Sequence, residues 1–496
     1  MRLGTLLEAA GIACPCGKED ISVTSIVTDS RKAVRGSMFI CIEGLRYDGH
    51  KFIKNALDAG ASVIIARHVR DDCVGGAAIV SVDNTRRAAA LLYNAWYGDP
   101  AGHLKMIGVT GTNGKTTVSF MIRRLLERSG LRCGLIGTLG AFLSENERID
   151  YPLCDPLANM TTPDAEGLYF ALSKMAERGI EYAVMEVSSH ALSMCRTDAI
   201  FFDTAVFTNL TQDHLDLHGS MEEYFLAKKK LFYNCRRAII NIDDPYGKKI
   251  FEEFPKGSIA CSRVGKGTFF SLNERLLGTD GVEFTARGGG EDTEIRLLIP
   301  GGFTVMNALE AFAAASGYIE NKQRLAEIFP DISGVPGRLE KIPTDADFCA
   351  YIDYAHTPDA LENLLRTAQG FRKDGERIVL LFGCGGERDR GKRREMAQIA
   401  SRFADLIIVT SDNSRGEDKG QIFSDIMRGI DKEKPHLIIE DRGDAIKYAV
   451  SHARAKDIIL LAGKGHEKYE IDSGGRRYFN EREIVLEALK DRRIDR

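Results

Sequence analysis

The chain has 496 residues, of which 44% are apolar and 28% are charged, and its formal net charge is −4. This length predicts about three domains, and the absence of a basic excess argues against a protein held to nucleic acid by phosphate contacts. No apolar run reaches the roughly 18–20 residues of a membrane span, and eleven scattered cysteines are typical of reduced thiols, so we expect a cytoplasmic protein without membrane spans.

Two segments rich in glycine and proline divide the chain. They lie at residues 97–100 and 332–338, and such residues usually separate structural elements. We therefore expect three domains with the bounds 1–98, 99–337 and 338–496.

The middle and last parts of the chain alternate short apolar runs with helical segments. The runs at 105–109, 182–187, 205–208 and 238–240 predict strands, and the pattern at 118–127, followed by Gly130, predicts a helix. Further strands are expected at 377–382, 405–410 and 457–462. This alternation is typical of an α/β protein with a mostly parallel sheet covered by helices on both faces. In such sheets ligands bind at the carboxyl ends of strands, so the three loops after the last strands are expected to line one site.

The strongest motif is a glycine-rich loop between a predicted strand and a predicted helix. Its residues are Gly111, Thr112, Asn113, Gly114, Lys115, Thr116 and Thr117. Backbone N–H groups of such a loop surround phosphate oxygens, the lysine binds the outer phosphates, and the threonine hydroxyl binds Mg²⁺. Val109 stands where the general pattern has its first glycine, so the loop has a variant shape. A kinase, an ATPase, a ligase and a non-catalytic nucleotide-binding module all remain open at this point.

Four further residues follow the loop and carry possible chemistry. Glu186 ends a predicted strand, where a carboxylate either binds Mg²⁺ or is simply exposed. His214 and His218 are four residues apart, so they would share a helix face, although a lone histidine is more often structural. Lys228 belongs to a run of three lysines, which by composition alone predicts a solvated surface.

Taken in order along the chain, these motifs resemble those of the Mur ligases of peptidoglycan synthesis. The resemblance rests on the loop at 111–117, on Glu186-Val187-Ser188-Ser189-His190, on Thr208-Asn209-Leu210 with Asp213-His214, and on Ala227-Lys228. The segments 383–389, 412–415 and 463–467 narrow it to the MurE type, which adds a diamino acid to UDP-N-acetylmuramoyl-L-alanyl-D-glutamate. The family implies an N-terminal UDP-binding α/β domain, a central P-loop ATPase and a C-terminal Rossmann-like domain.

The resemblance also implies a mechanism. ATP phosphorylates the side-chain carboxylate of D-Glu, and the amine of the amino acid then attacks the acyl phosphate, with domain closure bringing the two together. Lys115, Glu186, His214 and Lys228 are the implied catalytic residues. The implied metal ligands for Mg²⁺ are Thr116, Glu186, His214 and a carbamate formed on Lys228. Outside the loop, the residues implied to bind ATP are Asn307, Arg338 and Asp353.

The substrate sites follow from the same resemblance. The UDP-muramoyl-dipeptide is expected at Thr28, Ser30, Leu45, Arg46, Tyr47, Thr161, Thr162, Ser188, Met194 and Arg196. Met160 and Met194 depart from the polar residues usual there. The diamino acid is expected at Arg388, Asp412, Asn413, Ser414, Arg415, Gly463 and Glu467. Because a guanidinium can bind a second carboxylate at two points, Arg415 favours meso-diaminopimelate.

Other interpretations remain open from the sequence. Ser414 replaces a usual proline, which leaves L-lysine or another diamino acid as the alternative acceptor. A folylpolyglutamate synthase shares the ATPase core and the ligation chemistry, but the N-terminal UDP-type segments argue against it. We expect a monomer that acts in the synthesis of cell-wall precursors, and thus in cell shape and division, with small-molecule substrates.

Overall fold

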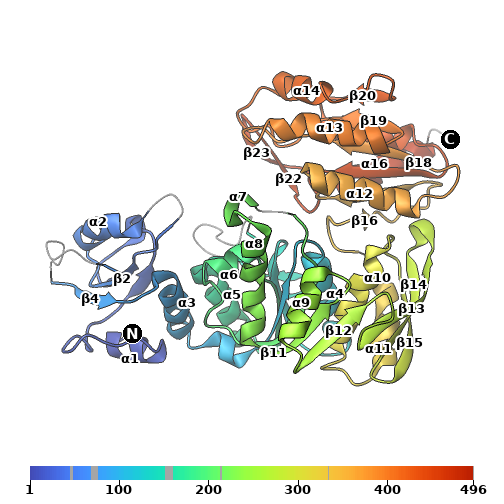
Figure 1. The fold of residues 1–496 in the computed structure, drawn as a ribbon. Coiled ribbons are helices and arrows are strands. Elements are labelled where there is room, and N and C mark those ends of the chain that lie inside the picture. Colours follow the sequence, from blue (N-terminus) through green and yellow to red (C-terminus); the bar gives the residue numbers. More distant parts are fainter. Residues whose placement is uncertain (45–47, 69–75, 151–159, 213–214, 333, 495–496) are drawn as a thin grey trace. The chain divides into compact units, whose positions relative to one another are not determined.

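The computed structural model describes residues 1–44, 48–68, 76–150, 160–212, 215–332 and 334–494. The chain forms two compact units, whose helices and strands are labelled in Figure 1. The first contains Met1–Ser262 and Glu310–Glu320, and the second contains Arg263–Leu309 and Asn321–Arg496. The predicted bounds of three domains stay a prediction.

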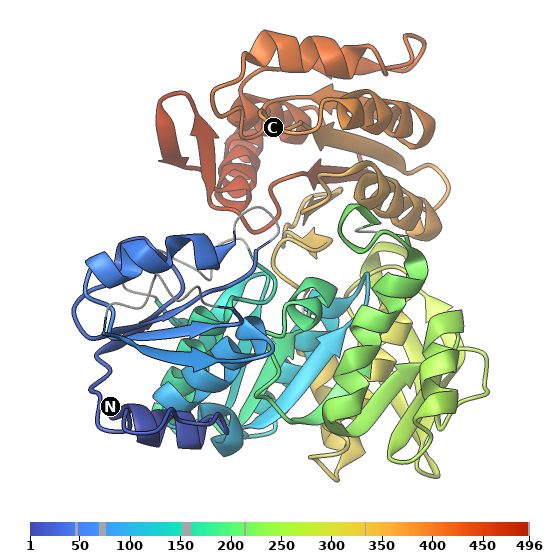
Figure 2. The same ribbon diagram turned by 60° about the vertical axis from the view of Figure 1, so that its left-hand side comes forward.

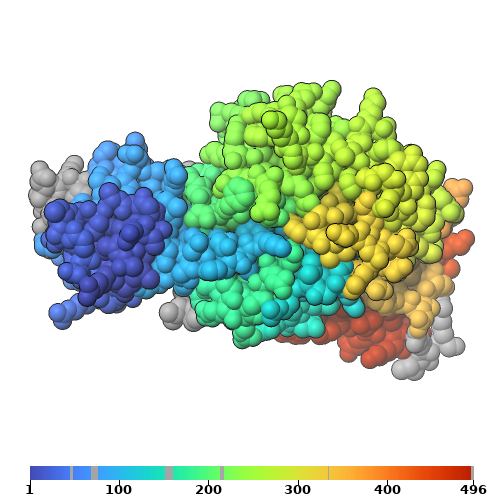
Figure 3. Space-filling model, turned by 90° about the horizontal axis from the view of Figure 1, so that it is seen from below, coloured from blue at the N-terminus to red at the C-terminus, as the bar shows by residue number. Residues whose placement is uncertain are grey.

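The first unit begins with a small parallel sheet of four strands in the order β1-β2-β3-β4. The strands are β1 (Ser25–Val27), β2 (Ser37–Ile40), β3 (Val63–Ala66) and β4 (Ala78–Ser81), and the helices are α1 (Leu3–Ala9), α2 (Ile53–Asp58) and α3 (Thr85–Trp96). Every residue of β2 and β3 is buried, as expected where both faces of a sheet are covered. Helix α3 packs against α5 (Ala165–Glu177). In the space-filling view, the N-terminal residues (dark blue) and the light blue residues that follow them are neighbouring parts of the surface (Figure 3).

A larger sheet follows, and the part of it that lies in the same unit has the strand order β12-β11-β10-β5-β9-β6-β7-β8. Its first six strands run parallel, while β7 and β8 are antiparallel. Their bounds are β5 (Lys105–Thr110), β6 (Cys133–Gly137), β7 (Gly140–Ser144), β8 (Glu147–Arg148), β9 (Tyr182–Glu186), β10 (Phe202–Phe207), β11 (Cys235–Asn241) and β12 (Ser258–Ser262). The mixed α/β class and the mostly parallel sheet confirm the prediction.

Helices connect these strands (Figure 2). They are α4 (Lys115–Arg128), α5, α6 (Ser189–Ser193), α7 (Leu215–His218), α8 (Met221–Lys229), α9 (Pro245–Glu253) and the end of α10 (Phe303–Ala315). Helix α4 begins three residues before the predicted segment, and Gly130 follows its end with a φ of 95°, the left-handed backbone that a glycine adopts without strain. Because β5 lies between β9 and β10, the loops after these three strands meet at one edge.

The second unit has its own parallel sheet, with the strand order β16-β17-β21-β18-β19-β20 and only β16 antiparallel. The bounds are β16 (Glu340–Lys341), β17 (Cys349–Asp353), β18 (Arg377–Phe382), β19 (Leu406–Val409), β20 (His436–Ile438) and β21 (Asp457–Ala462). Alternate residues of β18 enter two separate cores, Leu380 on one side and Val379 on the other. Helices α12 (Pro358–Phe371), α13 (Gly391–Phe403) and α14 (Lys419–Met427) cover the first face, and α15 (Arg442–Ser451) and α16 (Glu481–Ile494) cover the second.

Smaller elements complete the second unit. An antiparallel meander contains β13 (Phe269–Leu276), β14 (Val282–Gly288) and β15 (Glu291–Leu297), and α11 (Lys322–Ile328) packs on β15. A hairpin of β22 (Tyr469–Asp472) and β23 (Gly475–Tyr478) follows β21. In the described part of the chain, no helix is long and apolar enough to cross a membrane, and the cysteines described there are free thiols.

Candidate active site

The loop between β5 and α4 turns at two glycines that have left-handed backbones. The φ angles of Gly111 and Gly114 are 152° and 86°. A Cβ atom on Gly111 would lie 1.9 Å from the Oγ1 of Thr208, so no larger residue fits there without displacing that side chain. Gly114 precedes the first turn of α4, whose N–H groups are therefore available to an anion. Val109 lies in β5, which makes the variant position part of the strand.

The segment that follows β10 holds this loop in place. The backbone N–H of Thr112 donates to the carbonyl of Asn209 at 2.9 Å, and that of Asn113 donates to the Oδ1 of Asn209 at 2.9 Å. The hydroxyl of Thr208 donates to the carbonyl of Asn113 at 2.6 Å. The Thr-Asn-Leu motif singled out from the sequence thus contacts the loop directly and keeps its shape.

Two ammonium groups meet at one carbonyl of the loop. Lys115 donates to the carbonyls of Gly111 and Thr112 at 3.0 and 2.8 Å, and Lys228 donates to that of Gly111 at 2.7 Å. Lys228 is only 1% exposed, and its Nζ lies 4.6 Å from the centre of the Tyr224 ring. It does not lie on a solvated surface, so the surface interpretation of the lysine run is wrong for this residue. Carbamylation of Lys228 stays a prediction.

Glu186 ends β9 beside the loop and is 1% exposed. Its carboxylate accepts hydrogen bonds from the Thr116 hydroxyl at 2.9 Å and from the N–H and hydroxyl of Thr138 at 2.8 and 3.1 Å. Gly137 lies so close that an added Cβ would be 2.2 Å from the Glu186 Oε1. A hydroxyl and a carboxylate in contact are the oxygen donors that Mg²⁺ prefers, so this pair fits the predicted metal.

Of the two histidines four residues apart, the structure describes His218. His214 lies outside the described residues, together with its predicted metal role. His218 ends α7, where its Nε2 lies 3.0 Å from the Ser189 Oγ and its ring lies 5.0 Å from that of Tyr224. His218 is therefore held by the helix that follows Glu186.

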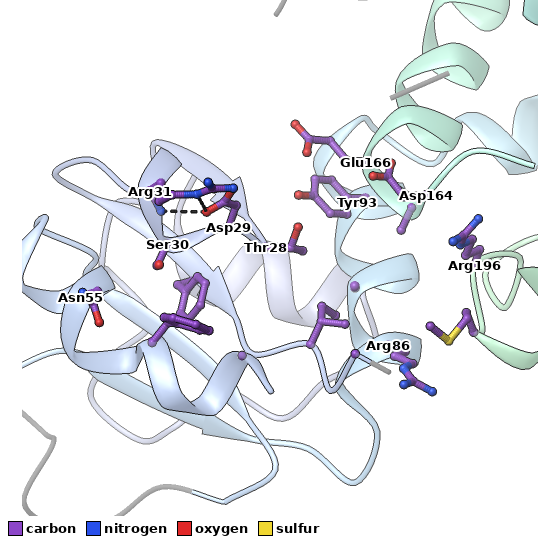
Figure 4. A pocket seen from close by; sticks show the side chains of 18 residues that line it. Thr28, Asp29, Ser30, Arg31, Asn55, Arg86, Tyr93, Asp164, Glu166 and Arg196 are labelled. Carbon is purple, nitrogen blue, oxygen red and sulfur yellow. Dashed lines mark hydrogen bonds and ion pairs between the residues drawn. The ribbon is translucent and has the colours of Figure 1, made fainter. Parts of the chain in front are cut away.

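A cavity of about 740 Å³ opens in the first unit between the small sheet and the helices α3, α5 and α6 (Figure 4). Four residues predicted to bind the UDP-muramoyl-dipeptide line it, namely Thr28, Ser30, Met194 and Arg196. Leu45, Arg46 and Tyr47 lie outside the described residues. The sequence did not single out five other polar lining residues, which are Asn55, Arg86, Tyr93, Asp164 and Glu166.

The other predicted substrate residues link this cavity to Glu186. The hydroxyl of Thr162 donates to the carbonyl of Glu186 at 2.8 Å and accepts from the N–H of Ser188 at 3.0 Å. Arg196 donates to the carbonyl of Thr162 at 2.8 Å. Thr161 accepts from the Thr138 hydroxyl at 3.3 Å. These hydrogen bonds connect the lining of the cavity to Glu186 and, through Thr116, to the 111–117 loop.

Three residues predicted to contact ATP lie in the second unit. Asn307 is on α10 and is buried. Asp353 ends β17 and accepts from the N–H groups of Leu339 and Ala355 at 2.7 and 2.8 Å. Burial raises the pKa of Asp353, and the nearby Arg338 opposes that rise.

The residues predicted for the diamino acid follow β18, β19 and β21 in the second unit. Asn413 donates from Nδ2 to the Glu467 carboxylate at 3.0 Å, and its Oδ1 accepts from Lys464 at 3.0 Å. Arg415 has a φ of 52°, and its Nη1 donates to the carbonyls of Gly386 and Asn413 at 2.9 and 3.2 Å. The structure thus brings the three loops together.

The remaining predicted residues of this group differ in exposure. Ser414 is buried, whereas Arg388 is exposed. A Cβ on Gly463 would lie 3.2 Å from the Asp412 carboxylate. Burial acts to raise the pKa of Asp412, but the positive charges of Lys464 and Arg442 outweigh it and hold that pKa below its usual value. Asp412 is therefore an ionised group of this loop cluster.

Sequence reasoning missed several residues that hold these sites. Thr138 bonds Glu186 from a turn without a motif, and Lys464 lies inside a recognised segment but was not given a role. Glu417 and the buried Arg393 form an ion pair at 2.7 Å beneath the β18 loop. A spacing of 24 residues between a glutamate and an arginine gives no periodic signal, so this pairing was not readable from the chain alone.

Comparison with known families gives three matches along the chain. Residues 22–107 match the Mur ligase family catalytic domain, residues 109–315 the Mur ligase middle domain, and residues 337–465 the Mur ligase glutamate ligase domain. A UDP-N-acetylmuramoyl-L-alanyl-D-glutamate–2,6-diaminopimelate ligase of Clostridium botulinum is 39% identical over 95% of this chain and 95% of its own length. The enzyme of the same name from Bacillus cereus is 39% identical, with 99% of each chain covered.

Solved structures give a consistent result. A structure of a UDP-N-acetylmuramoyl-L-alanyl-D-glutamate–2,6-diaminopimelate ligase matches with a TM-score of 0.72 and 31% identity, covering 99% of this chain and 100% of that one. A folylpolyglutamate synthase of Mycobacterium tuberculosis with ADP and AMPPCP has a TM-score of 0.58 at 21% identity, covering 76% of this chain and 92% of that one. At that identity the second likeness shows a shared fold alone.

Proposed function

The chain belongs to the Mur ligase family, and from that membership we infer that it joins 2,6-diaminopimelate to UDP-N-acetylmuramoyl-L-alanyl-D-glutamate with consumption of ATP. The reaction forms an amide bond and serves the synthesis of peptidoglycan precursors. The single observation that carries this conclusion is similarity to ligases of that one specificity over 95–99% of the chain at 38–39% identity. The meso stereochemistry of the diamino acid is the form we favour.

The first half of the reaction is the activation of the D-Glu carboxyl group. We assign Lys115 and the N–H groups of the 111–117 loop to the phosphate oxygens of ATP. The Lys115 ammonium, which donates to the Gly111 carbonyl, places positive charge where a phosphoryl group must be stabilised during transfer. The contacts from Asn209 and Thr208 fix the loop beforehand, so little reorganisation accompanies the transfer.

Mg²⁺ fits the oxygen donors of Thr116 and Glu186, with His214 and a carbamate on Lys228 as further proposed ligands. When bound, Mg²⁺ neutralises charge on the phosphate oxygens. Glu186 is already fixed by three hydrogen bonds from Thr116 and Thr138, so its carboxylate keeps one orientation. Lys228 holds its Nζ against the loop carbonyl and the Tyr224 ring.

The second half is capture of the activated carboxyl by the amine of the diamino acid. We assign Arg415 to the second carboxylate of that substrate. Within the described part of the chain, its Nη1 alone has partners, which leaves Nε and Nη2 for a carboxylate bound at two points. Glu467, which accepts from Asn413, is suited to bind an ammonium group of the same substrate.

We further propose that the protein acts as a monomer in the cytoplasm, where the nucleotide-linked substrate, diaminopimelate and ATP are its only partners. Size-exclusion chromatography with light scattering tests the monomer, for which the expected mass is 54.8 kDa. A stable dimer would contradict this part of the proposal and leave the reaction unaffected.

The decisive experiment measures ATP-dependent phosphate release with UDP-N-acetylmuramoyl-L-alanyl-D-glutamate and a panel of amino acids, with mass spectrometry of the product. We expect release with meso-diaminopimelate and much less with L-lysine. A folate substrate with glutamate forms the control arm. Turnover of the folate but not of the nucleotide substrate would overturn the proposal, and preference for L-lysine would overturn the acceptor.

A further inference from the structure

The hairpin of β22 and β23 contacts the loop at 412–415, which carries residues assigned to the diamino acid. The N–H of Arg415 donates to the carbonyl of Ile471 at 3.1 Å, and the N–H of Ile471 donates to the Oδ1 of Asn413 at 3.0 Å. Lys464 donates to the carbonyl of Tyr469 at 3.1 Å and to the same Oδ1 at 3.0 Å. The positions of Asn413 and Arg415 therefore depend on where β22 lies.

Glu470 is a buried acid of this hairpin, with 1% of its surface exposed. Its Oε1 accepts from the hydroxyl of Ser411 at 3.0 Å. Its Oε2 accepts from the Nε and Nη2 of Arg477 at 3.2 and 2.7 Å, and these two residues lie opposite each other in the hairpin. Because Ser411 directly precedes the loop at 412–415, one carboxylate joins both strands of the hairpin to the start of that loop.

Ser411 is held independently of its hydroxyl. Its N–H donates to the carbonyl of Glu440 at 3.2 Å, and its carbonyl accepts from Arg442 at 3.2 Å. Arg442 is fully buried and pairs with Glu481 at 2.8 Å. In the hairpin, by contrast, all four residues of β23 are exposed, and a two-stranded hairpin alone is marginally stable at best. Polar contacts to fixed parts of the unit, such as that of Glu470 with Ser411, therefore determine where the hairpin lies.

We propose that Glu470 is a positioning residue, which holds β22 against the loop at 412–415 and so orients Arg415 for the second carboxylate of the diamino acid. This inference rests on the proposed function, which assigns Arg415 to that carboxylate. Glu470 acts through the backbone of Ile471 and does not touch the substrate. Binding of a carboxylate at two points depends on the orientation of the guanidinium. Displacement of β22 should therefore weaken the binding of diaminopimelate more than that of L-lysine, which lacks the second carboxylate.

The test is steady-state phosphate release by the full-length protein, with diaminopimelate, L-lysine and ATP as the varied substrates. Glu470→Ala removes the carboxylate, and Arg477 stays hydrated because 53% of its side chain is exposed. We expect KM for diaminopimelate to rise about tenfold, KM for ATP to stay unchanged, and the preference for diaminopimelate over L-lysine to fall. Glu470→Gln keeps an oxygen that accepts from the Ser411 hydroxyl, so it should retain most of the affinity of the wild type.

Ser411→Ala removes the same contact from the other side and leaves the main-chain hydrogen bonds of this residue in place. We expect a smaller rise in KM for diaminopimelate. The double variant Ser411→Ala/Glu470→Ala should show no greater rise than Glu470→Ala alone, because both changes remove one shared hydrogen bond. Glu487→Gln, at an exposed carboxylate of α16, is the matched control and should behave as the wild type does.

Other results would overturn the inference in distinguishable ways. A wild-type KM for diaminopimelate in Glu470→Ala, with urea unfolding to show that the variant is folded, would remove the positioning role and leave the proposed function unaffected. An equal rise in KM for all three substrates would assign Glu470 to the stability of the unit alone. Wild-type kinetics of Ser411→Ala would refute the contact even if Glu470→Ala did not fold. If the wild-type protein releases no phosphate with diaminopimelate, the proposed function itself fails, and the inference fails with it.

Discussion

The carboxylate of Glu417 should control both the stability of the second unit and its affinity for the diamino acid. It accepts hydrogen bonds from both terminal nitrogens of Arg393 at 2.9 and 2.7 Å and from the N–H of Glu387 at 2.8 Å. Glu387 has a φ of 54° and follows Gly386, whose carbonyl accepts from Arg415. Replacing Glu417 with glutamine therefore disturbs the loop that holds Arg415.

The size of the effect follows from the burial of Arg393. Arg393 is 0% exposed, and its remaining carboxylate partner is Asp425 at 3.0 Å. Removing one partner of a fully buried pair costs about 3–5 kcal/mol. The cost is smaller here because Glu417 is only partly buried and Asp425 still compensates part of the charge. In glutamine an NH₂ group replaces one of the two carboxylate oxygens. One N–H donor therefore loses its acceptor, which costs about 1–3 kcal/mol. We expect the Glu417→Gln variant to lose about 2–4 kcal/mol of unfolding free energy.

The dependence on pH gives an independent check. Hydrogen bonds from Arg393 and from the N–H of Glu387 lower the pKa of Glu417 to about 2. A lowered pKa stabilises the fold above the unfolded value of about 4.5, and that contribution is lost as the pH falls toward 2. The difference between wild type and variant should therefore be constant from pH 5 to 7 and shrink below pH 4.5.

Urea unfolding at several pH values measures the stability, and steady-state kinetics measures KM for diaminopimelate and for ATP. We expect KM for diaminopimelate to rise at least tenfold while KM for ATP stays unchanged. Glu433→Gln, at an exposed carboxylate of the same unit, is the matched control. Stability and KM equal to those of wild type in Glu417→Gln would refute the reasoning.

Three shorter predictions concern the catalytic groups. Lys115→Ala should abolish phosphate release because the phosphoryl group loses its cation, and near-normal rates would mean that the loop has another role. Lys228→Ala should be inactive and partly rescued by acetate. An active variant would contradict the proposed carbamate on Lys228. Arg415→Ala should raise KM for diaminopimelate far more than KM for ATP, and comparison with L-lysine shows whether the second carboxylate is responsible.

The sequence predicted the parts of the fold that local pattern determines. The strand at 457–462 was placed with both ends correct, and the strand at 377–382 likewise, because buried parallel strands are continuous apolar runs. The sequence predicted the loop at 111–117 because its glycines and its lysine lie within one short segment. The left-handed backbones of Gly111 and Gly114 show why those positions are glycine.

The contacts that hold the site depend on tertiary packing and were not readable from the chain. Thr138 reaches Glu186 from a turn 48 residues away, and nothing in its surroundings distinguishes it from other threonines. The burial of Lys228 was also hidden, because a run of lysines looks solvated until the Tyr224 ring and the Gly111 carbonyl are placed around one of them. Local patterns identify reactive groups, whereas their orientation is set by residues that are distant in sequence.

The partners of the arginines separate those that hold the fold from those assigned to substrates. Arg393 and Arg442 are fully buried and paired with carboxylates at 2.7 and 2.8 Å, so their charges are compensated. Arg196 and Arg415 donate instead to backbone carbonyls, and within the described residues neither forms an ion pair with a carboxylate. A carbonyl orients a guanidinium without neutralising it, so the charge stays available to an anion. Arg415, whose charge stays available in this way, is therefore suited to the carboxylate of a substrate.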